Sequence, residues 1–313
     1  VVIGYLPSDV QLGGKMEINR DASVAAVQSV ADAMGIDLMA AAEGIIKIVN
    51  ESMFGALRLV SVEQGYDPRD FALVGFGGAG PLHANALGLL TDAWPVIIPP
   101  GPGVLCAYGD ATTQVQDEAA RTYLTMANDL SDTQLASDLH ELETRAGGAL
   151  LKDNIPVSEH EITYQADLRY AGQAFQITID FTEDELKEKG VALLTDQFDA
   201  EHEQLFTFKL DDGHEILMIR AVAKAKAKSI AENQIGQTGM GLEESKIIES
   251  RFYYEGEWHD AIIYDRNKLN VGLEVAGPAI VGEMDSTTVV LPGFVATVDA
   301  IGNLLINPVK RGK

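Results

Sequence analysis

The residues best suited to chemistry form a glycine-rich turn, "GFGGAG", at residues 75–80. Four of these six residues are glycine, and their order matches the dinucleotide fingerprint G-x-G-x-x-G. A site for NAD also needs an acidic residue at the end of the following strand, where it holds the ribose hydroxyls. Here that strand, "PVIIPPGP", ends in two prolines and Gly101, and the nearest acid, Asp92, precedes it. The sequence therefore argues against an NAD site.

Two interpretations of the glycine turn remain. Glycines permit a tight crossing from a strand to a helix, which would be a purely structural role. Alternatively, missing side chains at a helix N-terminus leave backbone N–H groups that a ligand can approach closely. Pro81 suits the first turn of a helix, so the second interpretation places the ligand at the start of "PLHANALGLL".

His83 and Asp110 are the candidate catalytic residues. His83 falls in the first turn of that helix, where the helix dipole disfavours the imidazolium and leaves a neutral imidazole to face a ligand. A packed or capping histidine is the structural alternative. Asp110 carries a carboxylate that can reach a metal or phosphate-bound water. Asp285 offers the same chemistry, but its position before "STT" is also typical of a β-turn.

Other reactive side chains lack the neighbours that catalysis requires. Cys106 has no Cys-His-Asx pattern around it, and we expect a small packed thiol. We expect Arg58 to be a surface or salt-bridged charge. The six histidines show no metal-binding spacing, so no metal ligands are assigned. A structural polar network on a hairpin is expected for Asp167, Arg169 and Gln173 of "DLRYAGQ".

The elements around the glycine turn alternate between helix and strand. Helices are predicted over 20–34, capped by Asp21 or Ser23, and over 38–64, where one apolar stripe should pack against another element. The apolar run at 71–76 predicts a strand buried on both faces, and "WPVIIPP" predicts another. This succession indicates an α/β layered fold.

The second half of the chain changes character. A helix is predicted over 131–152, a hairpin over "EITYQADLRYAG" and "FQITIDF", and a charged helix over 183–205. Strands and Gly/Pro turns dominate from residue 246 onward. The expected regions are an α/β portion at 1–128, an α+β region at 129–240 and an all-β C-terminal region at 241–313.

Composition narrows the function classes. The formal net charge of −24 disfavours binding to nucleic acid or to an anionic membrane surface. A lone cysteine allows no internal disulfide, which fits a reducing cytoplasm. No apolar stretch reaches the length of a membrane-spanning helix, and the N-terminus does not resemble a signal peptide. The chain opens on an apolar run without an initiator methionine, and we expect it to begin partway through a larger protein.

Longer strings carry a family resemblance. The run "ESMFGALRLVSVEQGYDPRDFALVGFGGAGPLHANALG", then "VIIPPGPGVLCAYGDATT", "DLRYAGQAF", "GPAIVGEMDSTTVVLPGF" and "DAIGNLLI" span nearly the whole chain. They resemble the hydantoinase A / N-methylhydantoinase / 5-oxoprolinase family, which includes subunits of acetone and acetophenone carboxylases. Where many members read Ser-Ala-Leu-Gly, this chain has Cys-Ala-Tyr-Gly at 106–109.

The resemblance implies an actin-like ATPase fold (ASKHA, ribonuclease H-like), with ATP and Mg²⁺ as cofactors. In that fold, a strand, a Gly-Gly turn and a helix lie beside the adenosine of ATP. Small residues in the next helix, here Ala107, Gly109 and Ala111, would let two lobes approach. The phosphate-gripping turn of the fold, of the Asp-Gly-Gly-Thr type, is absent from this sequence, so the chain is expected to hold half an ATP site. The cofactor-binding positions implied here are Gly77, Gly78, Ala79 and Gly80.

The resemblance also implies an activity: ATP-dependent hydrolysis of a cyclic amide such as hydantoin, N-methylhydantoin or 5-oxoproline. A ketone carboxylase subunit is the alternative enzyme, and a noncatalytic scaffold subunit is the alternative from another class. The implied partners are a hydantoinase B-type subunit and the missing N-terminal half of the same protein, in a hetero-oligomer. An acidic surface that meets basic residues on a partner would fit.

Overall fold

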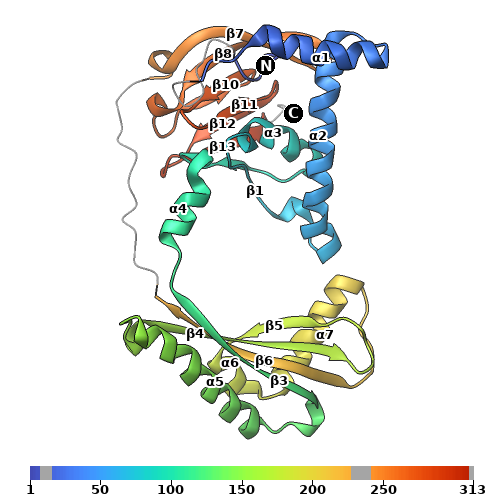
Figure 1. Cartoon of the computed structure of the whole chain (residues 1–313), viewed down its shortest axis with the longest axis vertical. Helices are drawn as coiled ribbons and strands as arrows, with labels where there is room; N and C mark the ends of the chain where they lie inside the picture. Colours follow the sequence, from blue (N-terminus) through green and yellow to red (C-terminus); the bar gives the residue numbers. More distant parts are fainter. Residues whose placement is uncertain (8–15, 227–240, 310–313) are drawn as a thin grey trace. The chain divides into compact units, whose positions relative to one another are not determined.

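The structure is a computed structural model, and it describes residues 1–7, 16–226 and 241–309 (Figure 1). It is a mixed α/β fold with several sheets and a strand-rich C-terminal region. No single helix in the described ranges has both the length and the apolar character needed to cross a membrane. Arg20–Met34 and Leu38–Gln64 meet those criteria only as a pair, which is bent by 94°.

Contacts between residues divide the chain into two compact units. Unit 1 comprises Val1–Ala111 and Ala231–Lys313, and unit 2 comprises Thr112–Ile230. Each unit has its own hydrophobic core. The functional regions expected at 1–128, 129–240 and 241–313 stay a prediction. What the contacts add is that the first and last parts of the chain share one core.

In its described residues, unit 1 combines four α-helices with two sheets. The helices are α1 (Arg20–Met34), α2 (Leu38–Val60), α3 (Gly80–Thr91) and α4 (Leu105–Thr112). One sheet has the strand order β1-β2-β13-β12-β9, and the other has the order β11-β10-β8-β7. The strands are β1 (Leu73–Val74), β2 (Val96–Ile98), β7 (Lys246–Tyr254), β8 (Glu257–Asp265), β9 (Glu274–Ala276), β10 (Ala279–Gly282), β11 (Thr287–Val290), β12 (Phe294–Val298) and β13 (Leu304–Pro308).

The C-terminal strands complete the sheet that begins with β1 and β2. β1 and β2 are parallel and are joined by α3, a βαβ connection. β13 then pairs antiparallel with β2, so that Leu305 lies opposite Ile97. Val96, Ile98 and Ile306 are fully buried where these strands meet. The all-β C-terminal stretch therefore supports the glycine turn directly.

The caps of the first two helices explain where they begin. Asn19, rather than Asp21 or Ser23, caps α1, because its side chain accepts a hydrogen bond from the Ala22 N–H at 2.9 Å. Gly35 ends α1 in the left-handed conformation. The side chain of Asp37 then caps α2.

The apolar stripe of α2 is only partly covered. α2 ends at Val60, and a 3₁₀ turn, Val62–Gln64, continues the segment predicted as a single helix. Met53 and Leu57 line an apolar groove together with β1 and α3. At the end of the same stripe, Val60 is 71% exposed. The expected packing partner of the stripe thus covers only its middle.

Unit 2 is a four-stranded antiparallel sheet with the order β3-β6-β4-β5. Helix α5 packs against β3, β4 and β6, and α7 packs against β4 and β5. Buried residues alternate along β5 and along β4 except at the register shift between Asp167 and Leu168, so one face of the sheet carries the core. The elements are β3 (Gln116–Met126), α5 (Asp132–Lys152), β4 (His160–Tyr170), β5 (Ile177–Phe181), α6 (Glu183–Lys189), α7 (Ala192–Phe206) and β6 (His214–Ala225).

The charged helix predicted over 183–205 is broken in two at Gly190. Gly190 has φ +63°, and a Cβ there would lie within 2.3–2.6 Å of the Asp132 carboxylate. The same carboxylate accepts a hydrogen bond from the Val191 N–H at 2.7 Å. The tertiary contact with α5 therefore ends α6 and starts α7. The β4–β5 hairpin was predicted, and Gly172 at φ +86° supplies its turn.

Candidate functional site

The glycine turn connects the end of β1 to the start of α3. The Gly75 N–H donates to the Ile97 carbonyl of β2 at 2.9 Å, so the turn leaves from the carboxyl edge of two parallel strands. Pro81 lies in the first turn of α3, as expected. Within residues 1–7, 16–226 and 241–309, no protein acceptor contacts the N–H groups of residues 78–80. These donors are free to bind a ligand or water.

At two of the four glycine positions, the fold itself requires glycine. A Cβ at Gly75 would lie 2.6 Å from the Ala84 Cβ and 2.7 Å from the Ile98 Cδ1, so only glycine lets α3 pack against β2 here. Gly77 has φ +83°, a conformation that residues with side chains rarely adopt. The structural interpretation of the turn is therefore sufficient for these two positions.

The other two glycines have no crowding that requires them. A Cβ at Gly78 would be 3.5 Å from the Asp285 carbonyl oxygen, which is an ordinary contact distance. At Gly80 the nearest atom, the carbonyl carbon of Gly75, is 3.9 Å away. Side chains would fit at both positions, and Gly78 is exposed. Bare backbone at these positions is what close approach by a ligand requires.

Three turns meet at this place, and we call them together the glycine corner: residues 75–80, residues 99–104 and the β10–β11 turn at residues 283–286. The Gly77 N–H donates to the Pro102 carbonyl at 2.8 Å, which joins the first two turns. The Gly101 N–H donates to Glu283 Oε2 at 3.2 Å, which joins the second to the third.

Asp285 lies within the β10–β11 turn and packs against the second turn. A Cβ at Gly103 would lie 2.6 Å from the Asp285 carbonyl oxygen and 2.7 Å from its Oδ2. Only glycine therefore allows this approach. The turn position of Asp285 matches the simpler of its two sequence interpretations.

A buried ion pair anchors the third turn. Arg266 Nε lies 3.5 Å from Glu283 Oε1, and the two side chains are only 6% and 9% exposed. Arg266 also donates to the Gly302 carbonyl. Burial raises the pKa of Glu283, and the nearby guanidinium partly offsets that rise. Burial likewise lowers the pKa of Arg266. Sequence reasoning missed this pair because the two residues lie on different elements.

His83 tethers α3 to α2. Its Nδ1 lies 2.7 Å from Asn50 Oδ1, so the imidazole donates from Nδ1. The ring is half-buried, and desolvation lowers the pKa of His83, which keeps the imidazole neutral at pH 7. Asn50 was not predicted, although a polar residue beside the apolar stripe of α2 was a usable signal. The structure brings His83 to Asn50 and not to Asp110.

Helix α4 carries the other singled-out residues of unit 1. Asp110 is exposed on it, and so are the small residues Ala107 and Ala111. Cys106 is exposed as well, so the expectation of a packed thiol is wrong. The reason is that α4 has no buried residue and hence no core-facing side.

The polar residues of "DLRYAGQ" in unit 2 satisfy one another. Asp167 is 1% exposed, forms an ion pair with Arg220 and accepts a hydrogen bond from the Thr178 hydroxyl at 2.7 Å. Arg169 donates to Glu215 at 2.7 Å. These contacts match the expected structural role.

Gln173 contacts a histidine that is completely buried. His202 is 0% exposed, and its Nδ1 lies 2.8 Å from the Phe208 carbonyl, to which it donates. Gln173 Nε2 lies 3.1 Å from His202 Nε2, which accepts from the amide. Both ring nitrogens of a neutral imidazole are thereby used. Aromatic rings surround His202: Tyr170, Phe175, Phe198, Phe206 and Phe208.

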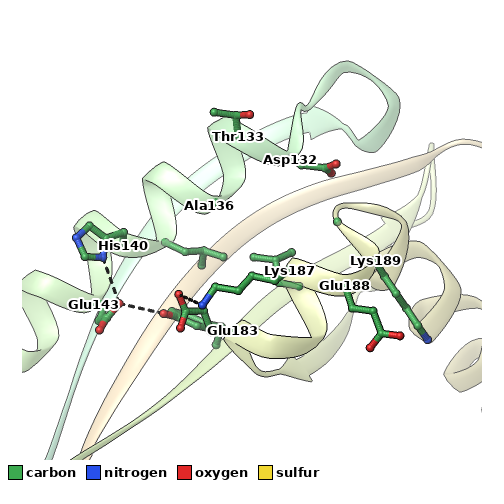
Figure 2. Close-up of a pocket in the computed structure, with 13 residues that line it drawn as sticks. Asp132, Thr133, Ala136, His140, Glu143, Glu183, Lys187, Glu188 and Lys189 are labelled. Atoms are coloured by element: carbon green, nitrogen blue, oxygen red, sulfur yellow. Dashed lines mark hydrogen bonds and ion pairs between the residues drawn. The ribbon is translucent and has the colours of Figure 1, made fainter. Parts of the chain in front are cut away.

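A cavity of about 540 Å³ lies between α5 and α6 in unit 2 (Figure 2). Glu143 accepts from the Tyr164 hydroxyl at 3.1 Å and lies 3.4 Å from His140. Lys187 pairs with Glu183 at 2.8 Å across one turn of α6. Acidic side chains outnumber lysines in the cavity lining, where Lys187 and Glu183 form an ion pair, and none of the predicted site residues lines it. Within the described ranges, no group of three or more His, Cys, Asp or Glu residues is arranged to hold a metal ion.

Comparison with known protein families covers nearly the whole chain. The hydantoinase/oxoprolinase family model matches residues 1–119, and the hydantoinase/oxoprolinase C-terminal domain model matches residues 126–305. The chain belongs to the hydantoinase/oxoprolinase family. This confirms the resemblance inferred from the sequence.

Individual relatives of this family member are considerably longer. An uncharacterized protein of Methanocaldococcus jannaschii is 33% identical over 98% of the chain and 43% of its own length. Caprolactamase subunit alpha of Pseudomonas jessenii is 28% identical over 98% of the chain and 45% of its own length. Acetone carboxylase beta subunit of Xanthobacter autotrophicus is 29% identical, with 96% and 44% covered. The chain thus spans less than half the length of these relatives.

A solved structure supports the same relationship. The crystal structure of ATP-dependent caprolactamase from Pseudomonas jessenii matches with a TM-score of 0.87 at 27% identity. The match covers 98% of this chain and 45% of that one. Fold and family therefore agree over almost all of the chain.

Proposed function

We propose that this chain is part of an ATP-dependent cyclic-amide hydrolase and forms the adenosine side of its ATP site. The ligand would lie against Gly77, Gly78, Ala79 and Gly80, in an actin-like ATPase fold. The observation that carries this proposal is bare, exposed backbone with free N–H donors at the N-terminus of α3. The caprolactamase relative, which is ATP-dependent, supports the same assignment.

The chemistry explains why ATP is needed. Amide carbonyls are poor electrophiles, and ATP would transfer its γ-phosphoryl group to the amide carbonyl oxygen, which releases ADP and activates the carbonyl carbon. Water would add to that carbon and the C–N bond of the ring would break, and a second water would release the phosphate from the acyl phosphate that remains. The described residues would bind and orient the adenosine, and Mg²⁺ would be held mainly by the phosphates. The phosphate-gripping turn is proposed to lie in the part of the longer protein outside this chain. Both His83, as a neutral imidazole facing the ligand, and Asp110 stay proposals as catalytic residues.

Replacement of Gly78 tests the ATP site. Gly78→Leu would fill the space proposed for the ligand, and we expect the dissociation constant for ATP to rise at least tenfold in the full-length protein. The matched control is Gly55→Leu on α2, where the glycine is also exposed and a Cβ meets no atom within 4 Å. Calorimetric titration with ATP measures both variants. Equal affinity in Gly78→Leu and Gly55→Leu would contradict the proposed site.

A partner subunit is also proposed. The relatives are named as alpha and beta subunits, and the chain spans less than half of their length. Ile48, Leu59 and Val60 on α2 are 68%, 55% and 71% exposed, which is unusual for large apolar side chains on one helix. We propose that a B-type subunit or the remaining part of the longer protein contacts this chain in a hetero-oligomer.

A ketone carboxylase subunit is the second candidate, because the acetone carboxylase beta subunit is 29% identical over 96% of the chain. Release of ADP by the full-length protein and its partner distinguishes the candidates. A hydrolase responds to caprolactam, hydantoin or 5-oxoproline without bicarbonate, whereas a carboxylase responds to acetone or acetophenone only with bicarbonate. Binding of the partner with no ADP release for any substrate would favour a scaffold subunit.

A further inference from the structure

The β10–β11 turn reaches the glycine corner from a distant part of the sequence. Glu283 Oε2 accepts from the Gly101 N–H at 3.2 Å, across 182 residues. Gly101 is followed by Pro102, whose carbonyl accepts from the Gly77 N–H at 2.8 Å. A continuous path of hydrogen bonds and covalent bonds therefore runs from the Glu283 carboxylate to the turn that carries the proposed ligand site.

Close packing adds a second link between the same turns. Asp285 occupies the space in which a Cβ of Gly103 would lie, and its carbonyl oxygen is 3.5 Å from the Cβ position of Gly78. The Glu283 N–H donates to the Ser286 carbonyl at 2.9 Å, which closes the β10–β11 turn on itself. Residues 283–286 thus form a hydrogen-bonded support that contacts both of the other turns.

The buried ion pair between Arg266 and Glu283 anchors this support. Arg266 Nε lies 3.5 Å from Glu283 Oε1, an ion-pair contact in which Oε1 accepts no hydrogen bond from a described residue, and Arg266 also donates to the Gly302 carbonyl. The hydrogen bond to Oε2 therefore holds the carboxylate at Gly101. A buried ion pair costs desolvation, and a pair of apolar residues is often at least as stable. Stability alone is therefore a weak reason for placing charges at this point.

We propose that Glu283 is a positioning residue for the nucleotide site: its carboxylate fixes the Gly101 turn, which in turn fixes Gly77 and the free N–H groups of residues 78–80. This proposal rests on the proposed ATP site. It assigns to the C-terminal strands a direct part in nucleotide affinity, and it predicts that the hydrogen bond to Gly101 matters more than the charge on Glu283.

Two double variants separate the hydrogen bond from the ion pair. Arg266→Met with Glu283→Gln removes both charges but keeps an amide oxygen that can accept from Gly101. Arg266→Met with Glu283→Leu removes the charges and the acceptor. Both variants lose the ion pair and the Arg266 bond to Gly302, so they are matched for those losses. Thermal unfolding shows whether both remain folded.

Two measurements on the full-length protein test the proposal. We expect the double variant with Glu283→Leu (the Leu variant) to bind ATP about tenfold more weakly than the double variant with Glu283→Gln (the Gln variant), because it lacks one hydrogen-bond acceptor. In the Leu variant, the KM for ATP should rise by a larger factor than kcat falls. Hydrogen exchange of residues 75–80 should be faster in the Leu variant, with exchange in unit 2 unchanged.

The outcomes are distinct. Equal ATP affinity and equal exchange of residues 75–80 in the two double variants would overturn the positioning role. If the unaltered protein does not bind ATP, the proposed function fails. Exchange of residues 75–80 still tests whether Glu283 fixes the corner in that case, because it needs no nucleotide. If the Leu variant does not fold, the Gln double variant is compared with the unaltered protein. Exchange of residues 75–80 that is as slow as in the unaltered protein supports the acceptor role, and faster exchange there, with unit 2 unchanged, overturns it.

Discussion

The glycine corner of unit 1 and the polar network around Asp167 and His202 in unit 2 differ in whether their polar groups have hydrogen-bond partners. In the network, Asp167 has Arg220 and Thr178 as partners, and buried His202 has a partner for each ring nitrogen. In the corner, side chains stop short of residues 78–80 and their N–H groups have no partner in the described parts of the chain. A satisfied network rigidifies a fold, whereas unpaired donors on bare backbone suit a ligand.

This difference indicates which regions of the chain should determine its stability and which should determine its affinity for ATP. Conspicuous polar residues such as those of "DLRYAGQ" satisfy one another and stabilise unit 2. The corner has few side chains and depends on main-chain geometry and on a remote carboxylate. Variants that change stability without changing ATP affinity should therefore map to unit 2, and variants that do the reverse should map to the corner.

The largest effect is expected in unit 2, from Arg220→Met. The variant leaves the carboxylate of Asp167, which is 1% exposed, without its charged partner. Breaking a buried pair in this way should lower the free energy of unfolding by about 3 kcal/mol. Hydrogen exchange of β4 and β6 measures the loss, and ATP affinity should not change. A loss below about 1 kcal/mol would mean that water satisfies Asp167 on its own.

The next effect separates the two classes of glycine within the corner. Gly75→Ala forces a Cβ to within 2.7 Å of two core atoms, so we expect a loss of about 1–3 kcal/mol in unfolding free energy. Gly80→Ala meets no atom closer than 3.9 Å, so stability should stay within about 0.5 kcal/mol while ATP affinity falls. Tryptophan fluorescence during urea unfolding suits both variants, because Trp94 and Trp258 lie in unit 1. Similar losses of stability in the Gly75→Ala and Gly80→Ala variants would contradict the division into crowded and uncrowded glycines.

A smaller effect concerns the pH dependence of unit 1. Burial lowers the pKa of His83 below its ordinary value of 6.5, so the unfolded chain binds the proton more readily than the folded one. Stability should therefore fall as the pH drops from about 6.5 toward the folded pKa, and His83→Gln should flatten that part of the profile. NMR titration of the ring gives a direct check. A His83 pKa at or above 6.5 would contradict the inferred burial.

The sequence predicted local features of the fold well. Capping residues predicted the extent of α1, apolar periodicity that of α5, and the composition around Gly172 the β4–β5 hairpin. The helix predicted over 38–64 ends at Val60, and the strand predicted as buried on both faces at 71–76 is limited to Leu73–Val74, where Val74 is 48% exposed. It could not give the pairing of β13 with β2, because strand pattern indicates a buried face but not the partner strand. The break at Gly190 was missed for a similar reason, since the carboxylate that requires it comes from α5.

The candidate site was predicted in part. The glycine turn was found because glycine is visible as a residue type, and the family resemblance supplied its proposed ligand. The sequence could not separate Gly75 and Gly77 from Gly78 and Gly80, because only the neighbouring atoms distinguish them. Glu283 and Asn50 were missed because each acts through a contact with a distant segment.

The smallest effect should come from Lys187→Met, which sharpens the comparison by repeating the Arg220 experiment at the surface. Lys187 and Glu183 are 2.8 Å apart, but their side chains are 62% and 61% exposed. Water screens such pairs, and the expected loss is below about 0.5 kcal/mol in urea unfolding. Because Lys187 also lines the cavity in Figure 2, a loss as large as that of Arg220→Met would show that solvent does not screen this cavity. The charged groups of the cavity would then be as strongly coupled as those around Asp167, and the cavity between α5 and α6 would become the better place to search for a ligand in unit 2.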